Sequence, residues 1–325
     1  MYLIKYSNIN PIVTTYYLNI IYCALIKKRE LVKKGKDWKD FNYKDGDIYV
    51  ISTATEALYL ILLNRPYIFW AQGVWPEESF MRNHSRIRFL LTSFIEKLAL
   101  VKAKYLFLVS NQMLLHYQKK YKINISSKVY IMPCSNDNLH EEVFSKKDYT
   151  KKTFCYAGAL SKWQCFEETL MLYKKIEDEY SETSLLLLVK NKEKAINLLK
   201  KYKISKYEID FVPVEELPNR LKDVNFGFLL RKDDIVNTVA TPTKLMTYLG
   251  NGIIPVYSCA LEAVDDMLKQ TRYKIRYMND GRISDIEEFF EKKINNNDIK
   301  KEYIEVFDKN FNKENQIDKL SKISL

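Results

Sequence analysis

The sequence of residues 225–257 predicts a strand, a polar loop, a helix and a second strand in close succession. Residues 226–230 form a short apolar run bounded by polar residues, which predicts a buried strand. Thr241-Pro242 predicts a helix start, with a hydroxyl cap before a proline in the first turn, and Gly250-Asn-Gly252 predicts its end. Residues 253–257 predict a second buried strand. Because this order recurs along the chain, the sequence favours an α/β fold with parallel sheets.

The polar loop of this unit is the first candidate site. Ligands of open α/β sheets bind beyond the carboxyl ends of the strands. Polar side chains available there are Arg231, Lys232, Asn237, Thr241, Thr243 and Lys244. Cations beside a helix N-terminus suit a phosphate or diphosphate. The alternative, an ordinary capped helix after a solvated loop, remains open at this point.

Two segments of the second half resemble the donor-binding domain of GT-B glycosyltransferases, especially the family 4 type. The stretch Ala240-Thr-Pro-Thr-Lys-Leu-Met-Thr-Tyr-Leu-Gly-Asn-Gly-Ile-Ile-Pro-Val256 resembles their donor-site segment. Phe154-Cys-Tyr-Ala-Gly158 resembles the strand and glycine turn that open their donor domain. The resemblance covers most of the chain, but its specific motifs lie in the second half.

The resemblance implies a GT-B fold, in which two Rossmann-like domains have parallel sheets that face each other across a cleft. It also implies a retaining transfer of sugar from a nucleotide-sugar donor, with no bound metal and no cofactor. Arg231 and Lys244 would then neutralise the leaving diphosphate as catalytic residues. The implied donor-binding residues are Gly158, Lys162, Asn237, Thr241, Pro242, Thr243 and Thr247.

One position departs from the family pattern. The family commonly has a glutamate, which holds the ribose hydroxyls, where this sequence has Thr247. A threonine can make only a shorter, neutral hydrogen bond. The departure puts ribose recognition in doubt and favours, as an alternative, a non-catalytic protein that binds sugar nucleotides.

The length of 325 residues predicts two domains. We expect an acceptor-binding domain over 1–150 and a nucleotide-sugar-binding domain over 151–325. The polar stretch 135–152 lacks apolar periodicity and is interpreted as the linker. Residues 300–323 predict a polar terminal helix, which the resemblance suggests crosses back to the first domain.

The loop after the strand predicted at 66–71 is the acceptor-side candidate. It brings together Gln72, Gly73, Glu77 and Glu78. A carboxylate there would orient an acceptor hydroxyl or take its proton, so Glu77 and Glu78 are candidate catalytic residues and Gln72 and Gly73 candidate acceptor contacts. Alternatively, Pro76-Glu77-Glu78 begins a helix whose dipole favours acids. The two interpretations are compatible.

Most of the formal net charge of +11 lies in residues 1–150. A basic half can face nucleic acid or an anionic membrane. No nucleic-acid motif accompanies it, so we favour a membrane surface, although a solvated basic face without a partner and a basic nucleic-acid-binding protein remain alternatives. A helix predicted at 87–102 has apolar residues that either pack on the sheet, the expectation we favour, or lie on a bilayer.

The cysteines and the absence of long apolar runs bear on location. The five cysteines are odd in number and lack metal-binding spacing, so free thiols inside the cell are expected and no metal site is predicted. No signal peptide or membrane-length apolar run is evident. We therefore expect a cytoplasmic protein, peripheral on the inner face of the cell membrane, that transfers sugar to a glycan or lipid-linked glycan in cell-surface polysaccharide assembly.

Overall fold

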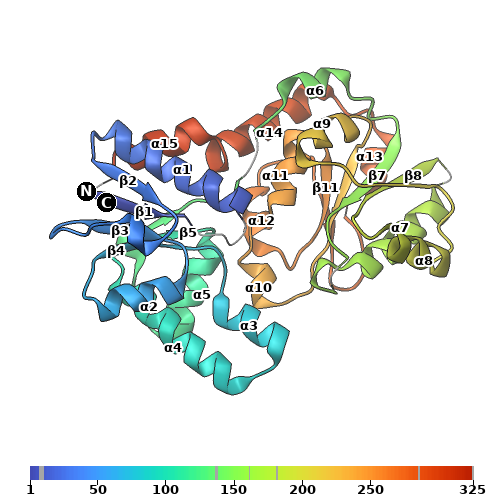
Figure 1. Ribbon diagram of the computed structural model, residues 1–325. Helices are drawn as coiled ribbons and strands as arrows, with labels where there is room; N and C mark the ends of the chain where they lie inside the picture. Colours follow the sequence, from blue (N-terminus) through green and yellow to red (C-terminus); the bar gives the residue numbers. More distant parts are fainter. Residues whose placement is uncertain (7–10, 136–137, 161, 181, 285, 324–325) are drawn as a thin grey trace. The chain divides into compact units, whose positions relative to one another are not determined.

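A computed structural model describes residues 1–325 apart from 7–10, 136–137, 161, 181, 285 and 324–325. The chain divides into two compact units (Figure 1). Unit 1 contains Met1–Asn136, Thr238–Thr241 and Asp308–Leu325, and unit 2 contains Asp137–Asn237 and Pro242–Phe307. Each unit is built around one parallel sheet of six strands.

The sheet of unit 1 follows the order β2-β1-β3-β4-β5-β6, and every neighbouring pair is parallel. Its strands are β1 (Tyr2–Lys5), β2 (Val32–Gly35), β3 (Ile48–Ile51), β4 (Tyr67–Ala71), β5 (Tyr105–Leu108) and β6 (Val129–Ile131). The strand predicted at 66–71 is β4. β2 carries no apolar signal of a strand, because it reads Val-Lys-Lys-Gly.

Among the described residues, six helices of eight or more residues accompany this sheet. They are α1 (Pro11–Lys27), α2 (Ala54–Leu62), α3 (Trp75–Asn83), α4 (Arg86–Lys102), α5 (Asn111–Tyr121) and α15 (Lys313–Ser321). Hydroxyl side chains cap three of them: Thr53 begins α2, Ser85 begins α4 and Ser110 begins α5. Each hydroxyl accepts a hydrogen bond from an amide of the first turn, which would otherwise be unsatisfied.

α1 and α15 lie side by side in unit 1 (Figure 1). One core cluster contains Leu18 and Ile21 of α1, Trp70 of β4, and Ile317 and Leu320 of α15. Tyr17 stacks on Trp70 at 3.8 Å between ring centroids. The last helix of the chain is therefore part of the hydrophobic core that the first helix builds.

The sheet of unit 2 follows the order β12-β11-β10-β7-β8-β9 and is also parallel throughout. Its strands are β7 (Lys152–Ala157), β8 (Thr183–Leu188), β9 (Tyr207–Asp210), β10 (Phe226–Leu229), β11 (Ile254–Ser258) and β12 (Ile275–Tyr277). The central strands are apolar on both faces because helices cover both. The rings of Phe154 and Phe226 stack at 4.9 Å between neighbouring strands.

The remaining helices run from Asp137 onwards. They are α6 (Glu141–Lys146), α7 (Phe166–Glu179), α8 (Lys192–Lys201), α9 (Leu217–Arg220), α10 (Ile235–Thr238), α11 (Thr243–Gly250), α12 (Glu262–Met267), α13 (Ile286–Glu291) and α14 (Asn296–Asn310). α11 follows β10 and precedes β11, as the unit at 225–257 predicts. Strands and helices thus alternate along the chain in both units.

Two sequence expectations about connections need comparison with the structure. The stretch 135–152, interpreted as the linker, contains the division between the two units, but it also contains α6, whose Phe144 is buried, and the start of β7. The tail at 300–323 is not one helix, because α14 ends at Asn310 and Asn312 caps α15. α6 could not be recognised from the sequence, because Phe144 is its one buried residue and gives no apolar periodicity.

Gly227 of β10 gives a direct test of this packing. A methyl group at Gly227 would lie 2.7 Å from two ring carbons of Tyr248 in α11. We therefore expect Gly227→Ala to lower the free energy of unfolding by about 1–3 kcal/mol through overpacking. Chemical denaturation of the variant and the wild type measures the difference. An unchanged unfolding free energy would contradict the close approach of α11 to β10.

Candidate functional site

Three strands of unit 2 bring candidate residues to one edge of the sheet. β10 pairs in parallel with both β7 and β11, so the carboxyl ends of all three meet at the same edge. Gly158 follows β7, Arg231 follows β10 closely and Ser258 ends β11. This is the edge at which open α/β sheets bind ligands.

Lys244, in the first turn of α11, is enclosed at this edge. Its Nζ donates a hydrogen bond to Oε1 of Gln164 at 2.9 Å and lies 4.3 Å from the ring centroid of Tyr156. Burial holds the pKa of Lys244 well below its ordinary value, and the positive charge of Arg231 lowers it further. Gln164 and Tyr156 were not singled out as site residues from the sequence, although Tyr156 lies in the stretch before Gly158 that resembles the start of a donor domain.

Gly158 makes room for this ammonium group. A Cβ at Gly158 would lie 3.0 Å from both Cε and Nζ of Lys244. The backbone of Gly158 also has a φ of +143°, which side chains disfavour. The glycine that the sequence marks as a ligand contact is thus a neighbour of Lys244.

Arg231 is the second cation at the edge. Its amide N–H donates to Oγ of Ser258 at 2.8 Å, and its Nη1 donates to the carbonyl oxygen of Leu230 at 2.9 Å. Burial lowers the pKa of the Arg231 guanidinium. Within the described part of the chain, neither Arg231 nor Lys244 forms an ion pair with a carboxylate. Both residues are partly buried, and an anion would stabilise the charged form of each.

The start of α11 differs from the sequence expectation. Pro242 occupies the cap position, and no side chain caps the helix. The hydroxyl of Thr241 instead accepts a hydrogen bond from the amide of Cys134 at 3.1 Å, so its predicted role as the cap is wrong. Proline has no side-chain acceptor to offer, which leaves the first-turn amides beginning at Thr243 without a capping side chain.

Asn237 and Thr247 make local hydrogen bonds. The Nδ2 of Asn237 donates to the carbonyl oxygen of Lys232 and to Oδ2 of Asp234, so this buried amide fixes the loop before α11. The hydroxyl of Thr247 donates to the carbonyl oxygen of Thr243 at 3.3 Å within α11. The side chain of Lys162, also a candidate, lies outside the described part of the structure.

A cavity of about 340 Å³ opens beside Arg231. Cys165, Glu168, Lys232, Asp233 and Asn279 contribute to its wall. Asn279 donates a hydrogen bond from Nδ2 to Oδ2 of Asp233 at 3.2 Å. The cavity is therefore lined by groups of both signs, and Arg231 is its enclosed cation.

Unit 1 has a larger cavity, of about 490 Å³, at the carboxyl edge of its own sheet. Gln72, Gly73 and Glu78 line it, together with Ser52 and Thr53, which follow β3. Oε1 of Glu78 lies where a side chain at Gly73 would begin, since a Cβ there would be 2.0 Å away. Burial raises the pKa of Glu78, and the charge of Arg82 opposes this. The structure thus brings three of the four acceptor-side candidates together.

Glu77, the fourth, points to α5 instead. Its Oε1 lies 2.8 Å from Nζ of Lys120 and 3.0 Å from Nε2 of His116. Burial alone would raise the pKa of Glu77, but the hydrogen bonds from His116 and Lys120 outweigh it and lower the pKa. These contacts give Glu77 a structural role in joining α3 to α5.

Glu96 of α4 is the acid that sequence patterns missed. It is buried, accepts a hydrogen bond from the amide of Trp75 at 3.1 Å and one from the hydroxyl of Tyr121 at 2.6 Å, and borders the same cavity. Burial raises its pKa to about 7. A glutamate in the middle of a helical sequence carries no signal of burial, which explains the omission.

Glu96 predicts a pH-dependent stability. A raised pKa means that the folded state favours the protonated carboxyl of Glu96. The stability that this preference adds is fully present below the pKa of an unfolded glutamate and is lost as the pH rises through about 7. Above that pH the ionised group costs the folded state on the order of 3 kcal/mol. We expect Glu96→Gln to unfold with a free energy less dependent on pH between about 5 and 8. Its amide oxygen can still accept from the amide of Trp75, and its NH2 group can donate to the hydroxyl oxygen of Tyr121.

Chemical denaturation across this pH range, with the wild type in parallel, measures the effect. Identical pH profiles for the two proteins would show that Glu96 does not titrate in this window. Glu193→Gln, at an exposed acid in the first turn of α8, controls for removal of one charge.

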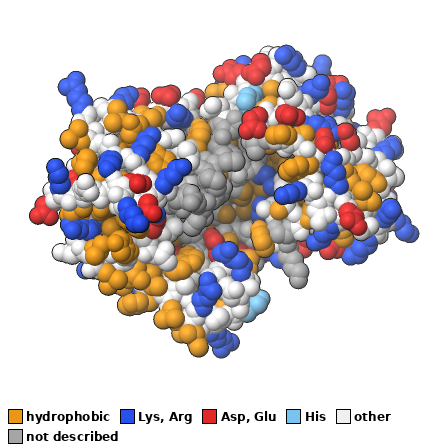
Figure 2. Space-filling view, viewed as in Figure 1, with side chains coloured by type: hydrophobic (Ala, Val, Ile, Leu, Met, Phe, Trp, Pro, Cys, Tyr) orange, Lys and Arg blue, Asp and Glu red, His pale blue; other side chains and the backbone are white. Residues whose placement is uncertain are grey.

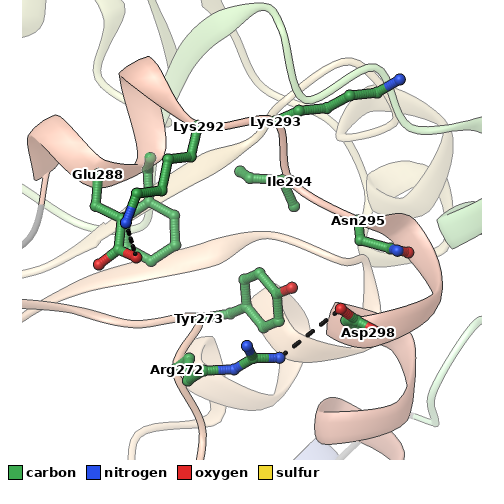
Figure 3. Close-up of a pocket in the computed structure, with 9 residues that line it drawn as sticks. Arg272, Tyr273, Glu288, Lys292, Lys293, Ile294, Asn295 and Asp298 are labelled. Carbon is green, nitrogen blue, oxygen red and sulfur yellow. Dashed lines mark hydrogen bonds and ion pairs between the residues drawn. The ribbon is translucent and has the colours of Figure 1, made fainter.

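A third pocket, of about 260 Å³, lies in unit 2 beside residues that precede β12 (Figure 3). It is at the amino end of that strand, whereas Arg231 follows the carboxyl end of β10. Its charges are largely paired: Lys292 with Glu288 at 3.0 Å, and Arg272 with Asp298 at 3.8 Å (Figure 3). The pocket therefore offers less to a charged ligand than the edge that carries Arg231 and Lys244.

The described residues contain no group of three or more His, Cys, Asp or Glu side chains arranged to hold a metal ion. None of the helices within the same residues combines the length and the apolar character needed to cross a membrane.

Comparison with known proteins places the fold. No protein-family model and no curated protein sequence matches the chain. Among solved structures, Anabaena HepE, crystallised with UDP and glucose, shares 9% identity over 99% of this chain and 98% of its own, with a TM-score of 0.64. The lipopolysaccharide outer core galactosyltransferase WaaB shares 12% identity over 94% of this chain and 98% of its own, with a TM-score of 0.62.

A third match covers less of the other protein. The match to S. aureus TarM, which was crystallised with UDP, covers 94% of this chain and only 59% of TarM, at 9% identity and a TM-score of 0.59. The matches of this kind are GT-B glycosyltransferases, and the two parallel six-stranded sheets agree with them. The protein therefore has the GT-B fold, as the sequence resemblance implied; at these identities the comparison establishes the fold alone.

Gly158 provides a test of the cation site. We expect Gly158→Ala to weaken binding of nucleoside diphosphates, because the new methyl group displaces Lys244, and to destabilise the fold by about 1–3 kcal/mol through its backbone strain. Gly281→Ala is the matched control, since Gly281 has a φ of +85° and open space where a Cβ would lie. Thermal unfolding with and without nucleotide separates the two effects. Equal nucleotide responses in the two variants would contradict the role of Gly158 as a spacer for Lys244.

Proposed function

We propose that the protein is a glycosyltransferase that moves a sugar from a nucleotide-sugar donor to a glycan or lipid-linked glycan acceptor. The observation that carries this proposal is the pair of enclosed cations, Arg231 and Lys244, beside an uncapped helix start at the ligand-binding edge of a GT-B fold. The negatively charged diphosphate of a nucleotide would complement these two cations and the free N–H groups of the helix start.

The proposed donor site uses the carboxyl edge of the sheet in unit 2. Transfer breaks the bond between the sugar and the diphosphate, and negative charge develops on the leaving oxygen. Arg231, Lys244 and the first-turn amides of α11 would stabilise this charge without reorganising, because they are already in place. We propose that the transfer retains the anomeric configuration and uses no metal. UDP is the nucleotide we would test first, because it was present with TarM and HepE.

The proposed acceptor site is the 490 Å³ cavity of unit 1. Glu78, whose pKa is raised by burial, would orient an acceptor hydroxyl, with Gln72 and the backbone of Gly73 as further contacts. Ser52 and Thr53 add hydroxyl groups suited to a sugar. We also propose that the reaction serves cell-surface polysaccharide assembly at the inner face of the cell membrane; the basic first half of the chain supports this location.

Arg231 tests the proposal directly. We expect Arg231→Ala to weaken binding of UDP about tenfold or more and to lower turnover by roughly two orders of magnitude, the scale of losing one donor to the developing charge. The control is Arg282→Ala, an exposed arginine of the same unit whose partner is Asp280. Turnover is measured as UDP released from a panel of UDP-sugars with glycan acceptors.

Thermal unfolding with UDP, GDP, CMP and ADP completes the experiment, because selective binding to the folded state raises the melting temperature. A rise with one nucleotide that Arg231→Ala abolishes and Arg282→Ala keeps supports the donor site. No rise with any nucleotide would remove the main support of the proposal. Binding without release of diphosphate from any sugar nucleotide would favour the non-catalytic alternative suggested by Thr247.

A further inference from the structure

α4 of unit 1 has its hydrophobic stripe on the outside. Ile87, Leu90, Leu91 and Phe94 are each 61–75% exposed, and Val101 is 43% exposed. With 3.6 residues per turn, these positions and Leu98 fall within an arc of about 100°. The buried positions of the same helix are Thr92, Glu96, Ala99 and Leu100, on the opposite side.

Contacts within unit 1 explain why this helix is turned that way. The buried face of α4 accepts hydrogen bonds at Glu96 from Trp75 of α3 and from Tyr121 of α5. Tyr67 of β4 donates from its hydroxyl to the carbonyl oxygen of Ala99 at 2.9 Å. These polar contacts fix the rotation of α4, so its apolar stripe has no place in the core. Core packing, which the sequence analysis favoured for the apolar residues of this helix, therefore does not hold for Leu90, Leu91 and Phe94.

The exposed apolar surface extends to a neighbouring helix. α2 packs against α4, and its Leu62 is 77% exposed. Figure 2 shows hydrophobic side chains gathered over the part of unit 1 where Figure 1 places α2 and α4. A contiguous apolar surface of this kind marks an interaction site.

The charges around the stripe are of one sign. Arg86 and Lys97 flank it on one side, and Arg88 and Lys102 on the other, by the same helical spacing. The only acid between residues 80 and 104 is Glu96, which is buried on the opposite side. The surface therefore combines an apolar stripe with positive flanks, the pattern of helices that lie in a membrane interface.

We propose that α4 lies in the surface of an anionic lipid bilayer, with Ile87, Leu90, Leu91 and Phe94 among the acyl chains and the flanking cations at the lipid headgroups. The long side chains of arginine and lysine reach the headgroups while their stems cover apolar surface. A second copy of this chain fits less well, because two such surfaces would bring like charges together. Nucleic acid would satisfy the cations but leave the stripe exposed to water.

This inference refines the proposed membrane location and is independent of sugar transfer, because lipid binding is measured without nucleotide. The probe is vesicle flotation with phosphatidylcholine alone and with added phosphatidylglycerol. We expect the wild type to float with the anionic vesicles and to do so less in high salt, since each basic residue near the surface contributes roughly fivefold in affinity.

Two substitutions separate insertion from charge attraction. We expect the double variant Leu90→Asp, Phe94→Asp to lose vesicle binding roughly tenfold or more, because it places carboxylates among the acyl chains. The matched control is Leu115→Asp, which alters a 56% exposed leucine of α5 in the same unit and should bind as the wild type does. Unchanged melting temperatures confirm that both variants fold.

A conservative variant reports on insertion directly. Phe94→Trp adds a fifth tryptophan, at the centre of the stripe, and the wild type with its four tryptophans gives the background emission. We expect the variant, relative to the wild type, to gain emission at shorter wavelength on anionic vesicles and to be quenched more by brominated acyl chains. Equal flotation of the double variant and the wild type, or no flotation of the wild type, would overturn the proposal. The proposal would also be overturned if the wild type bound no vesicles but formed a concentration-dependent dimer, and if the double variant lost that dimer.

Discussion

Parallel pairing of β10 with both β7 and β11 determines where the cations of unit 2 lie. In an antiparallel arrangement Gly158 and Arg231 would leave the sheet at opposite edges. In the parallel arrangement both lie at one edge, and the helix between β10 and β11 must begin there. Lys244 therefore enters the site from the first turn of α11, where Gly158 leaves space for it. Fold topology thus brings together two cations, neither of which forms an ion pair with a carboxylate among the described residues.

The edge of unit 2 that carries Arg231 and Lys244 could largely be predicted from the sequence because its signals are local. An apolar run, a glycine turn and a proline near a helix start are each set by neighbouring residues, so β10, α11 and β11 were found to within a residue or two. The role of Thr241 was not, because its hydroxyl bonds the amide of Cys134, more than a hundred residues away. Gln164 and Tyr156 were missed for the same reason: only the fold brings them to Lys244.

α4 shows the limit of periodicity in the other direction. Its pattern predicts an amphipathic helix, and the structure has one at Arg86–Lys102. Periodicity shows which residues share a face, but it does not show which way that face points. Here the polar face is inside, because Glu96 accepts hydrogen bonds from Trp75 and Tyr121. A buried acid on one face of a helix can therefore determine which side chains the opposite face exposes to solvent.

The return of α15 to α1 has a consequence for the order of folding during synthesis. Unit 1 contains both the first residues of the chain and Asp308–Leu325, with Ile317 and Leu320 in its core. Unit 2, apart from a short excursion at Thr238–Thr241, is continuous between them. Since chains are made from the N-terminus, the ribosome completes unit 2 first. The part of α1 that packs against α15 therefore stays uncovered until Lys313–Ser321 have been synthesised.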